Sequence, residues 1–397
     1  MAARPFQVTI LADDLTGACD TGCLFAGAGA VGVTAAPLLV GDDPAVLAVD
    51  TGSRALAPPA AAEAVHAAAR ALGGRLDAGV TFKKIDSTMR GHVAVELDAL
   101  LEHGSRFTGA LVCPAFPAQR RVVSHGRLLV DGVPLHESSI ARDPALRGGS
   151  AELSALLDGS RRVVRLGLDD VRAGHEKIAH VLEQHPGALF ASDAETDADL
   201  ASLAAAALAV PGTLAAGAAG LGRALALALG LAAPPAPLPP GPARLVVVGS
   251  LHPASRAQVD ALARRGVAVV TVDDTGGDPD SAIEALRGGR PAVVTSGTAT
   301  ISHRPAAREA IARQLARAAA RVIAGARPDL VAVTGGDTAR ALLEALRPRR
   351  FDLLGAPADG LALGRLALAA GDSLPLLTKA GGFGEPDLFT TLLGGTS

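Results

Sequence analysis

Aromatic residues are scarce in this sequence of 397 residues: they make up 2% of the chain, and tryptophan and tyrosine are absent. The net charge is −3 at pH 7, and no block of basic residues interleaved with aromatic ones occurs. Proteins that bind single-stranded nucleic acid combine a basic groove with aromatic side chains that stack on the bases. The composition therefore argues against a nucleic-acid partner.

Cysteine is also rare, and its three copies, Cys19, Cys23 and Cys113, are too few and odd in number for a disulfide framework. Cys19 and Cys23 lie one helical turn apart, but no nearby histidine pair or further cysteine completes a metal site. We therefore predict that they lie on a buried helix face. The chain begins Met-Ala-Ala-Arg-Pro without the apolar core of a signal peptide, so we expect a cytoplasmic protein.

Two common nucleotide-binding motifs are missing. The P-loop sequence G-x-x-x-x-G-K-[ST] does not occur. A G-x-G-x-x-G string covers residues 27–32, but it follows a predicted helix and precedes a predicted strand. A dinucleotide-binding fingerprint does the reverse, because it follows a strand and opens a helix. We interpret the string as a helix end.

A long run of Ala, Leu and Gly covers residues 200–231 and raises the question of a membrane segment. Pro211, several glycines and Arg223 interrupt it. We interpret the run as buried helices of a globular domain and expect no membrane partner.

Length and composition predict two domains, because 397 residues exceed what one hydrophobic core usually supports. Residues 232–242 carry six prolines and predict a stiff linker between residues 1–231 and 243–397. Predicted strands alternate with helices on both sides. We expect an α/β protein of two domains, each a mostly parallel sheet flanked by helices, with the active site in the cleft between them.

Residues 80–92 contain the highest concentration of charged and hydroxyl side chains that could form a site. A β-prone run, Val80 to Phe82, leads into Lys84, Asp86, Ser87 and Arg90, and a helix-spaced apolar pattern follows. This order places polar groups at the carboxyl end of a parallel strand, where Ser87 and Thr88 can cap the helix and the cations favour an anion. A capped helix with surface ion pairs is the plainer alternative.

Two further predicted strands in the first half end in polar residues. The apolar run of residues 6–12 ends at Asp13 and Asp14, and the strand of residues 45–49 ends in the segment that contains Arg54. Paired carboxylates at a strand end suit gripping sugar hydroxyls, accepting a proton or holding Mg²⁺ through water. A helix cap explains Asp14 alone and leaves Asp13 unexplained.

Three predicted strands in the second half end in glycine-rich turns. These turns are Gly-Ser at 249–250, Thr-Gly-Gly-Asp-Thr at 334–338 and Lys-Ala-Gly-Gly-Phe-Gly at 379–384. Glycines let backbone N–H groups approach phosphates, and a following helix N-terminus adds its dipole. One such turn is commonly just a tight connection, but three in one domain indicate a nucleotide site.

Five motifs together resemble the four-carbon acid sugar kinase family. They are ADDLTGACDTG (12–22), KKIDSTMRG (83–91), CPAFPAQ (113–119), GDTA (336–339) and KAGGFG (379–384). Members of this family phosphorylate D-threonate, D-erythronate or 3-oxo-tetronate with ATP. They have an N-terminal acid-sugar-binding domain and a C-terminal nucleotide-binding domain, which the resemblance implies for this chain.

The resemblance also implies the site residues. Contacts to the acid sugar are expected from Asp13, Asp14, Arg54, Lys84, Asp86, Ser87 and Arg90. Contacts to ATP are expected from Ser250 or Ser255, Gly335, Gly336, Asp337, Thr338, Gly381 and Gly382. The family's G-S-x-S-x-x-T motif here reads Gly-Ser-Leu-His-Pro-Ala-Ser, so the sequence leaves open which serine meets the nucleotide.

We expect in-line transfer of the ATP γ-phosphoryl group to a terminal hydroxyl, with Mg²⁺ bridging the phosphates. Asp86, Arg90 and Asp14 are the catalytic candidates. Asp86 is the first choice for general base, since Lys84 and Arg90 flank it and keep it ionised. Arg90 or Lys84 would steady the developing charge. Asp13 and Asp14 remain alternatives for the base, and no direct metal signature is present.

Two other functions compete with the kinase. A nicotinamide-dependent dehydrogenase needs a G-x-G-x-x-G in the right context, which this chain lacks. A sugar-acid sensor without catalytic activity would keep the first site but would not need three glycine-rich strand ends. The stereochemistry of the acid and self-association into a homo-oligomer are left open.

Overall fold

The computed structural model describes residues 7–35, 44–103, 106–143, 146, 149–273, 277–297, 305–369 and 371–393. The chain divides into two compact units, Met1–Ala233 and Pro234–Ser397. Each unit contains a mostly parallel sheet flanked by helices, so the predicted α/β class is confirmed. In the described part of the chain, no helix is long and apolar enough to cross a membrane.

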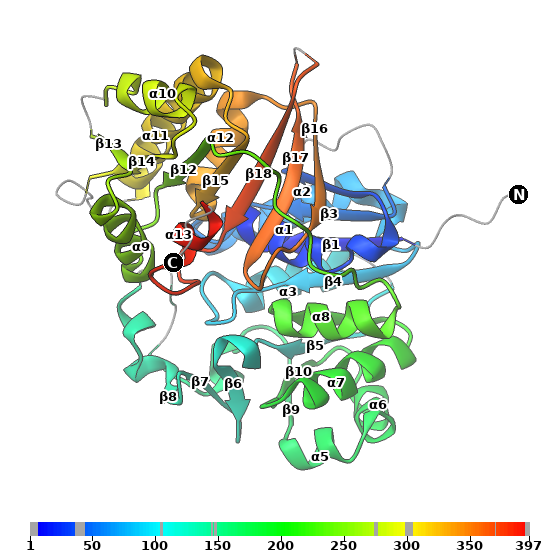
Figure 1. The fold of residues 1–397 in the computed structure, drawn as a ribbon. Coiled ribbons are helices and arrows are strands. Elements are labelled where there is room, and N and C mark those ends of the chain that lie inside the picture. Colours follow the sequence, from blue (N-terminus) through cyan, green and yellow to red (C-terminus); the bar gives the residue numbers. More distant parts are fainter. Residues whose placement is uncertain are drawn as a thin grey trace, which may run out of the picture. The chain divides into compact units, whose positions relative to one another are not determined.

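The first unit is built on a sheet with the strand order β2, β3, β1, β4, β11, β5, β10, β9, and neighbouring strands are parallel (Figure 1). Strands β1, β3 and β5 are buried along their whole length, which explains their nearly continuous apolar sequences. The bounds are β1 Val8–Ala12, β2 Val31–Ala35, β3 Val46–Asp50, β4 Val80–Lys84, β5 Gly109–Cys113, β9 Val163–Leu166, β10 Leu189–Ser192 and β11 Thr213–Gly217.

From the middle of this sheet, the chain proceeds toward one edge after β1 and toward the other edge after β4. Helix α1 (Leu15–Cys23) carries the chain from β1 toward β2, and α3 (Val93–His103) carries it from β4 the other way, toward β5. Because such crossovers are right-handed, α1 covers one face and α3, with α2 (Pro58–Leu72), covers the other. The reversal lies between the neighbours β1 and β4, which is where open α/β sheets bind ligands.

Further helices complete the first unit. Helices α7 (Asp197–Ala209) and α8 (Ala219–Ala228) pack together on the same face as α1, and α5 (Leu168–Arg172) and α6 (His175–Gln184) pack against α7. The short α4 (Leu153–Leu156) precedes β9. A small antiparallel sheet of β6 (Arg121–Ser124), β7 (Arg127–Val130) and β8 (Val133–Pro134) follows the end of β5.

The prediction of buried helices alone for residues 200–231 is wrong. Strand β11 lies inside that run, between α7 and α8, and pairs with both β4 and β5. Small residues hide the strand in sequence, because Leu-Ala-Ala-Gly has neither alternation nor β-branched side chains. Gly217 needs to be glycine, since a Cβ there would lie 2.7 Å from the carbonyl oxygen of Cys113 on the neighbouring strand.

Two other local predictions are confirmed. The G-x-G-x-x-G string ends a helical segment: a 3-10 turn covers Ala26–Ala28, Gly29 has φ 92°, and β2 begins at Val31. Cys19 and Cys23 are buried on α1 with 0% and 2% of their surface exposed. The proline-rich residues 232–242 form neither helix nor strand.

The second unit has the strand order β13, β14, β12, β15, β18, β17, β16. The first five strands are parallel, whereas β17 runs antiparallel to both of its neighbours. The bounds are β12 Arg244–Val248, β13 Ala268–Val272, β14 Ala292–Ser296, β15 Leu330–Thr334, β16 Arg350–Gly355, β17 Leu361–Ala367 and β18 Ser373–Lys379.

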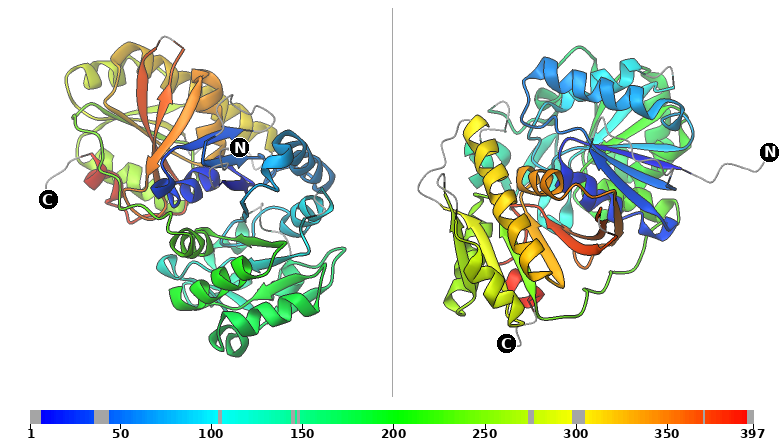
Figure 2. Two further views of the ribbon diagram at one scale, coloured as in Figure 1. Left: turned by 90° about the vertical axis from the view of Figure 1, so that its right-hand side faces the viewer. Right: turned by 90° about the horizontal axis from the view of Figure 1, so that it is seen from above.

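In the second unit, too, the connections after two neighbouring central strands lead toward opposite edges of the sheet. Helix α9 (Pro253–Arg264) leads from β12 toward β13, whereas α12 (Gly336–Leu346) leaves the neighbouring β15 in the other direction. Helix α13 (Leu388–Leu392) packs beside α9, and Phe389 is buried with sheet residues such as Val246 and Leu377. Helices α10 (Asp280–Arg287) and α11 (Pro305–Ala326) pack together, and Figure 2 shows α11 beside α12.

Candidate functional site

Three neighbouring parallel strands of the first unit bring the predicted acid-sugar residues together. In the register of β3, β1 and β4, Ala12 lies opposite both Asp50 and Lys84. The segments that follow these strands therefore leave the sheet at one edge, beside the switch point between β1 and β4. They contain six of the seven residues that the sequence predicts for this site, and the seventh, Lys84, is the last residue of β4.

Arg54 holds the two aspartates at the end of β1. Its Nε and Nη2 donate to Asp13 Oδ2 and Oδ1 at 2.7 Å each, and its Nη1 and Nη2 donate to Asp14 Oδ2 and Oδ1 at 2.7 and 2.9 Å. Asp14 also caps α1, as predicted, by accepting from the backbone N–H of Gly17 at 2.9 Å. Two carboxylates thus share one guanidinium.

Arg90 forms a bidentate ion pair with Asp86. Arg90 Nε and Nη2 donate to Asp86 Oδ2 and Oδ1 at 2.9 and 2.7 Å, and the Thr88 hydroxyl also donates to Oδ2. Arg90 Nη1 donates to Asp143 Oδ2 at 3.2 Å. The predicted cap by Ser87 and Thr88 is not seen, because α3 begins only at Val93 and Thr88 binds Asp86 instead.

Lys84 is a buried cation of this site with two spare hydrogen-bond donors. Its ammonium donates to the carbonyl oxygen of Ile85 at 2.9 Å, and the described residues offer it no carboxylate partner. A lysine has three donors, so two remain for a ligand. Gly17 makes room for it, because a Cβ at Gly17 would lie 3.2 Å from Lys84 Nζ.

A buried ion pair that the sequence analysis missed lies behind the site. Lys83 Nζ is 2.6 Å from Glu96 Oε2, and Ser53 Oγ donates to Glu96 Oε1 at 2.8 Å. All three side chains are almost completely buried. A signal was present in the sequence: Glu96 falls on the apolar stripe of its helix, with Val93, Leu97 and Leu100. Asp143 was missed without any such signal.

Burial raises the pKa values of the carboxylates Asp13 and Asp86, whereas the neighbouring arginines lower them. For Asp86, burial raises the pKa, but the charge and hydrogen bonds of Arg90 outweigh it and hold the pKa well below its usual range. For Asp13, burial is likewise outweighed by Arg54, Lys83 and Lys84, and the pKa is lowered. For Glu96, burial prevails over Lys83 and the pKa is raised.

The three glycine-rich turns of the second unit also meet. Strands β12, β15 and β18 are parallel neighbours, so the turns after Val248, Thr334 and Lys379 leave one edge of the sheet at its switch point. A Cβ on Gly381 would overlap the hydroxyl of Ser250, and a Cβ on Gly335 would lie 3.4 Å from the Ser250 nitrogen. Ser250, Gly335, Gly336, Gly381 and Gly382 are partly exposed, and Asp337 is exposed.

The two predicted serines have different surroundings. Ser255 is fully buried, and its hydroxyl donates to the carbonyl oxygen of Gly381 at 2.7 Å. Ser250 accepts from the backbone N–H of His252 at 3.2 Å and is partly exposed. Thr338 is 3% exposed, and it packs so closely on Gly249 that a Cβ there would overlap its hydroxyl. Ser255 and Thr338 therefore support the turns from inside.

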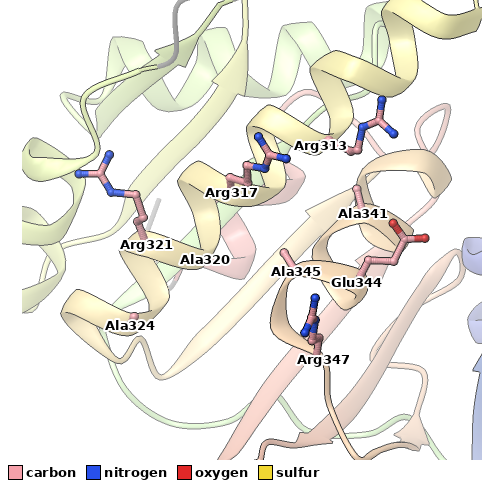
Figure 3. A pocket seen from close by; sticks show the side chains of 9 residues that line it. All are labelled: Arg313, Arg317, Ala320, Arg321, Ala324, Ala341, Glu344, Ala345 and Arg347. Carbon is pink, nitrogen blue, oxygen red and sulfur yellow. The ribbon is translucent and has the colours of Figure 1, made fainter.

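Within the described part of the chain, no group of three His, Cys, Asp or Glu side chains is placed to hold a metal ion. A hollow of about 600 Å³ lies between α11 and α12 (Figure 3). Arg313, Arg317 and Arg321 of α11 line it with the last turns of α12. It therefore adjoins the end of α12 opposite to Gly336 and is separate from the glycine-rich turns.

Comparison with known proteins identifies both regions. A model described as a sugar-binding N-terminal domain matches residues 8–225, and one described as a nucleotide-binding C-terminal domain matches residues 245–389. A D-threonate kinase of Bordetella bronchiseptica is 35% identical over 96% of this chain and 95% of its own length. The chain belongs to the four-carbon acid sugar kinase family.

Other similar proteins agree with membership of the four-carbon acid sugar kinase family. A 3-oxo-tetronate kinase of Pseudomonas fluorescens is 30% identical and covers 97% of this chain and 96% of its own length. A solved structure from Salmonella typhimurium, described as a putative tRNA synthase, has a TM-score of 0.77 at 21% identity and covers 97% of this chain and 98% of that one. At that identity the likeness shows the fold alone.

Proposed function

We propose that this protein transfers the γ-phosphoryl group of ATP to the terminal hydroxyl of a four-carbon sugar acid of the D-threonate, D-erythronate or 3-oxo-tetronate type. Family membership makes it a kinase of such acids. One observation carries the finer proposal: each matched region gathers its predicted residues at the switch point of its own sheet. We assign residues 1–231 to the acid sugar, 232–242 to a linker and 243–397 to the nucleotide.

Lys84 is the proposed partner of the substrate carboxylate, because it is a buried cation with unused donors. Ser87 is partly exposed and is a proposed contact to a hydroxyl. The substrate carboxylate also attracts Arg54, which draws the guanidinium away from Asp13 and Asp14. The freed carboxylates then accept hydrogen bonds from the sugar hydroxyls.

Side-chain exposure favours Asp14 over Asp86 as general base. Their contacts are alike, since Asp14 accepts from Arg54 and from the Thr16 hydroxyl much as Asp86 accepts from Arg90 and the Thr88 hydroxyl. Asp86 carries a bidentate arginine and a hydroxyl, and its lowered pKa makes it a weak base. Its proposed role is to orient Arg90, which stabilises the charge of the transferring phosphoryl group. Asp14 has the most exposed side chain of the three, at 15%, against 4% for Asp13 and 9% for Asp86.

In this scheme Asp14 accepts the proton of the terminal hydroxyl as its oxygen attacks the γ-phosphorus. The bond from that phosphorus to the β–γ bridging oxygen breaks, and ADP leaves with the electron pair. The products are ADP and the phosphorylated acid.

The glycine-rich turns are the proposed nucleotide site. Gly336, Gly381 and Gly382 would offer backbone N–H groups to the phosphates, and Ser250 would offer its hydroxyl. The N–H of Gly335 already donates to the carbonyl oxygen of Lys379 at 3.3 Å, so Gly335 is proposed to line the site through its lack of a side chain. Ser255 and Thr338 support these turns, because both are buried.

Magnesium fits this second site in one respect. Asp337 is an exposed carboxylate at the first turn of α12. Mg²⁺ in kinases is typically bound through one or two carboxylates together with substrate phosphates and water. Asp337 is the residue that would hold it, and the ion would neutralise phosphate charge. That the reaction takes place in a cleft between the two domains stays a prediction, as does a homo-oligomer.

A substrate panel tests the proposal. Release of ADP is measured with D-threonate, L-threonate, D-erythronate and 3-oxo-tetronate, with Mg²⁺ present. We expect ADP release to depend on one or more of these acids and on ATP. Binding of an acid without ADP release from any of them would favour the sensor instead.

A further inference from the structure

A buried lysine lies beneath the last glycine-rich turn. Lys379, at the end of β18, is 1% exposed. Its ammonium donates to the carbonyl oxygens of Ala380, Gly381 and Phe383 at 2.9, 3.3 and 2.7 Å, so all three donors are used. The ring of Phe389 lies 5.8 Å from the nitrogen. The described residues place no carboxylate within ion-pair distance of it, which is unusual for a buried charge.

Two side chains of α9 hold the same turn from the same side. Gln258, which is fully buried, donates through Nε2 to the carbonyl oxygens of Phe383, Gly384 and Glu385 at 3.1, 3.0 and 3.0 Å. Ser255 donates to the Gly381 carbonyl. Every carbonyl from residue 380 to residue 385 except that of Gly382 is thus bound by Lys379, Gln258 or Ser255.

This pattern fixes where the N–H groups of the turn point. In a trans peptide the C=O and the following N–H are antiparallel. Since the carbonyls of residues 380, 381 and 383 point at the ammonium, the N–H groups of Gly381, Gly382 and Gly384 point away from it. Among the described residues, no hydrogen bond to the N–H of Gly381 or Gly382 is present. Both are therefore available to an anion.

We propose that Lys379 is a positioning residue for the nucleotide: its ammonium fixes the carbonyl groups of the turn so that the N–H groups of Gly381 and Gly382 bind a phosphate, and phosphate binding keeps the ammonium protonated. The inference rests on the proposed nucleotide site. Lys379 itself does not touch the phosphate. It acts through the turn and through its charge, which lies on the far side of the peptide groups that bind the phosphate.

The surroundings of Lys379 make its charge sensitive to a bound anion. Burial lowers the pKa of Lys379 to about 7, and no charge of a neighbouring side chain contributes to that shift. The titratable or charged side chains on the turns and helix starts around it include His252, Arg256, Asp337, Asp359, Glu385 and Asp387. Histidine is the residue type whose charge ordinarily changes between pH 5 and 8, so His252 is controlled for with a variant.

Protonation of Lys379 and binding of ATP should favour each other, which sets the direction of the pH dependence. In the free protein at pH 8, a lysine with a pKa of about 7 is mostly neutral. A bound phosphate raises that pKa, so binding takes up a proton. The affinity for ATP therefore falls as the pH rises above 7, by up to about tenfold per pH unit. Phosphate groups are already deprotonated at pH 8 and do not contribute to uptake there.

The experiment is titration calorimetry of the full chain with MgATP at pH 8, in buffers of different ionisation enthalpy and without any sugar acid. We expect uptake of about 0.5–0.9 proton per ATP for the unmodified protein. Lys379→Met should take up almost none, weaken ATP binding at pH 6.5 by about tenfold, and show a flat affinity from pH 7 to 9. Its kcat at saturating ATP should change little.

Two further variants separate position from charge. Gln258→Met loosens the turn but keeps the ammonium, so it should weaken ATP binding and retain proton uptake. His252→Asn can still cap α9 and should leave the uptake unchanged. If the unmodified protein binds ATP at pH 8 without proton uptake, or if Lys379→Met takes up as much, the inference fails. If the unmodified protein does not bind ATP, the nucleotide site itself is misassigned.

Discussion

The two predicted binding regions lie at equivalent places in their sheets but use opposite chemistry. The site after β1, β3 and β4 contains three aspartates, two arginines and a lysine, and its arginines are already paired with the aspartates. The site after β12, β15 and β18 has glycine, serine and backbone N–H groups at its surface, and its one buried ammonium is turned toward carbonyls.

This difference follows from what each site has to bind. A small sugar acid offers one carboxylate and several hydroxyls, which side-chain charges can select, and it must compete with internal ion pairs to enter. A triphosphate offers many oxygens to close-lying backbone, and any added side chain is in the way. Substitutions should therefore affect the first site through charge and the second through volume.

The largest effect is expected at the proposed general base. Asp14→Asn keeps the size of the side chain and an oxygen that can cap α1, but removes the base, so kcat should fall by about 10²–10⁴. Asp86→Asn is the matched variant. It should weaken the orientation of Arg90 and change the KM for the acid as well as kcat. A normal kcat for Asp14→Asn with a large loss in Asp86→Asn would return the base to Asp86.

Arg54→Ala should come next. It removes a predicted contact to the acid and leaves Asp13 and Asp14 without a counter-charge, so the KM for the acid should rise about 10²-fold and the free energy of unfolding should fall by about 3–5 kcal/mol at pH 7. Arg70→Ala is the control, since its partner Glu63 is exposed. An unchanged KM for the acid in a folded Arg54→Ala protein would remove Arg54 from the site.

Arg54→Ala should also change how the free energy of unfolding depends on pH below about pH 4. The folded pKa values of Asp13 and Asp86 lie below their ordinary values. Their contribution to the free energy of unfolding is therefore complete above about pH 4 and is lost as the pH falls below that through the folded pKa. Denaturant unfolding at pH 7 and pH 3 should show a smaller difference for Arg54→Ala than for the unmodified protein.

At the second site, added side-chain volume should weaken the binding of ATP. Gly336→Val adds a branched side chain where the backbone is proposed to approach phosphate, so the KM for ATP should rise about tenfold while binding of the acid stays the same. Gly288→Ala is the control: it ends α10 with φ −81°, and the nearest atom to its Cβ is 3.4 Å away. Loss of acid binding alone in Gly336→Val would reverse the domain assignment.

The smallest effect is expected for the two serines, and it separates their roles. Ser250→Ala should raise the KM for ATP a few-fold with little loss of stability, since Ser250 is partly exposed. Ser255→Ala leaves the Gly381 carbonyl with only the longer hydrogen bond from Lys379 and should lower the free energy of unfolding by about 1–3 kcal/mol. Equal effects of both variants on KM and stability would contradict the distinction.

The sequence could predict both sites because each depends on local order. A strand followed by a polar or glycine-rich turn places that turn at a carboxyl end, and carboxyl ends of parallel strands meet at one edge. The cap by Asp14 was predictable for the same reason, since its partner Gly17 lies three residues away.

Contacts between distant segments could not be predicted. Arg54 meets Asp13 across 41 residues, and Arg90 meets Asp143 across 53. Strand order decides these pairs, and nothing in the sequence places β3 and β4 on either side of β1. Strand β11 was missed because its small residues carry no period, and Ser255 could not be told from Ser250 without knowing which one is buried.

Identification of the phosphorylated product tests the central claim most directly. The unmodified protein is incubated with ATP, Mg²⁺ and the acid that gave ADP release, and the products are followed by phosphorus NMR and mass spectrometry. We expect one ADP for each molecule of acid converted, with a single phosphomonoester on the terminal carbon of the acid. Release of inorganic phosphate with the acid unchanged, or oxidation of the acid without phosphorylation, would contradict it.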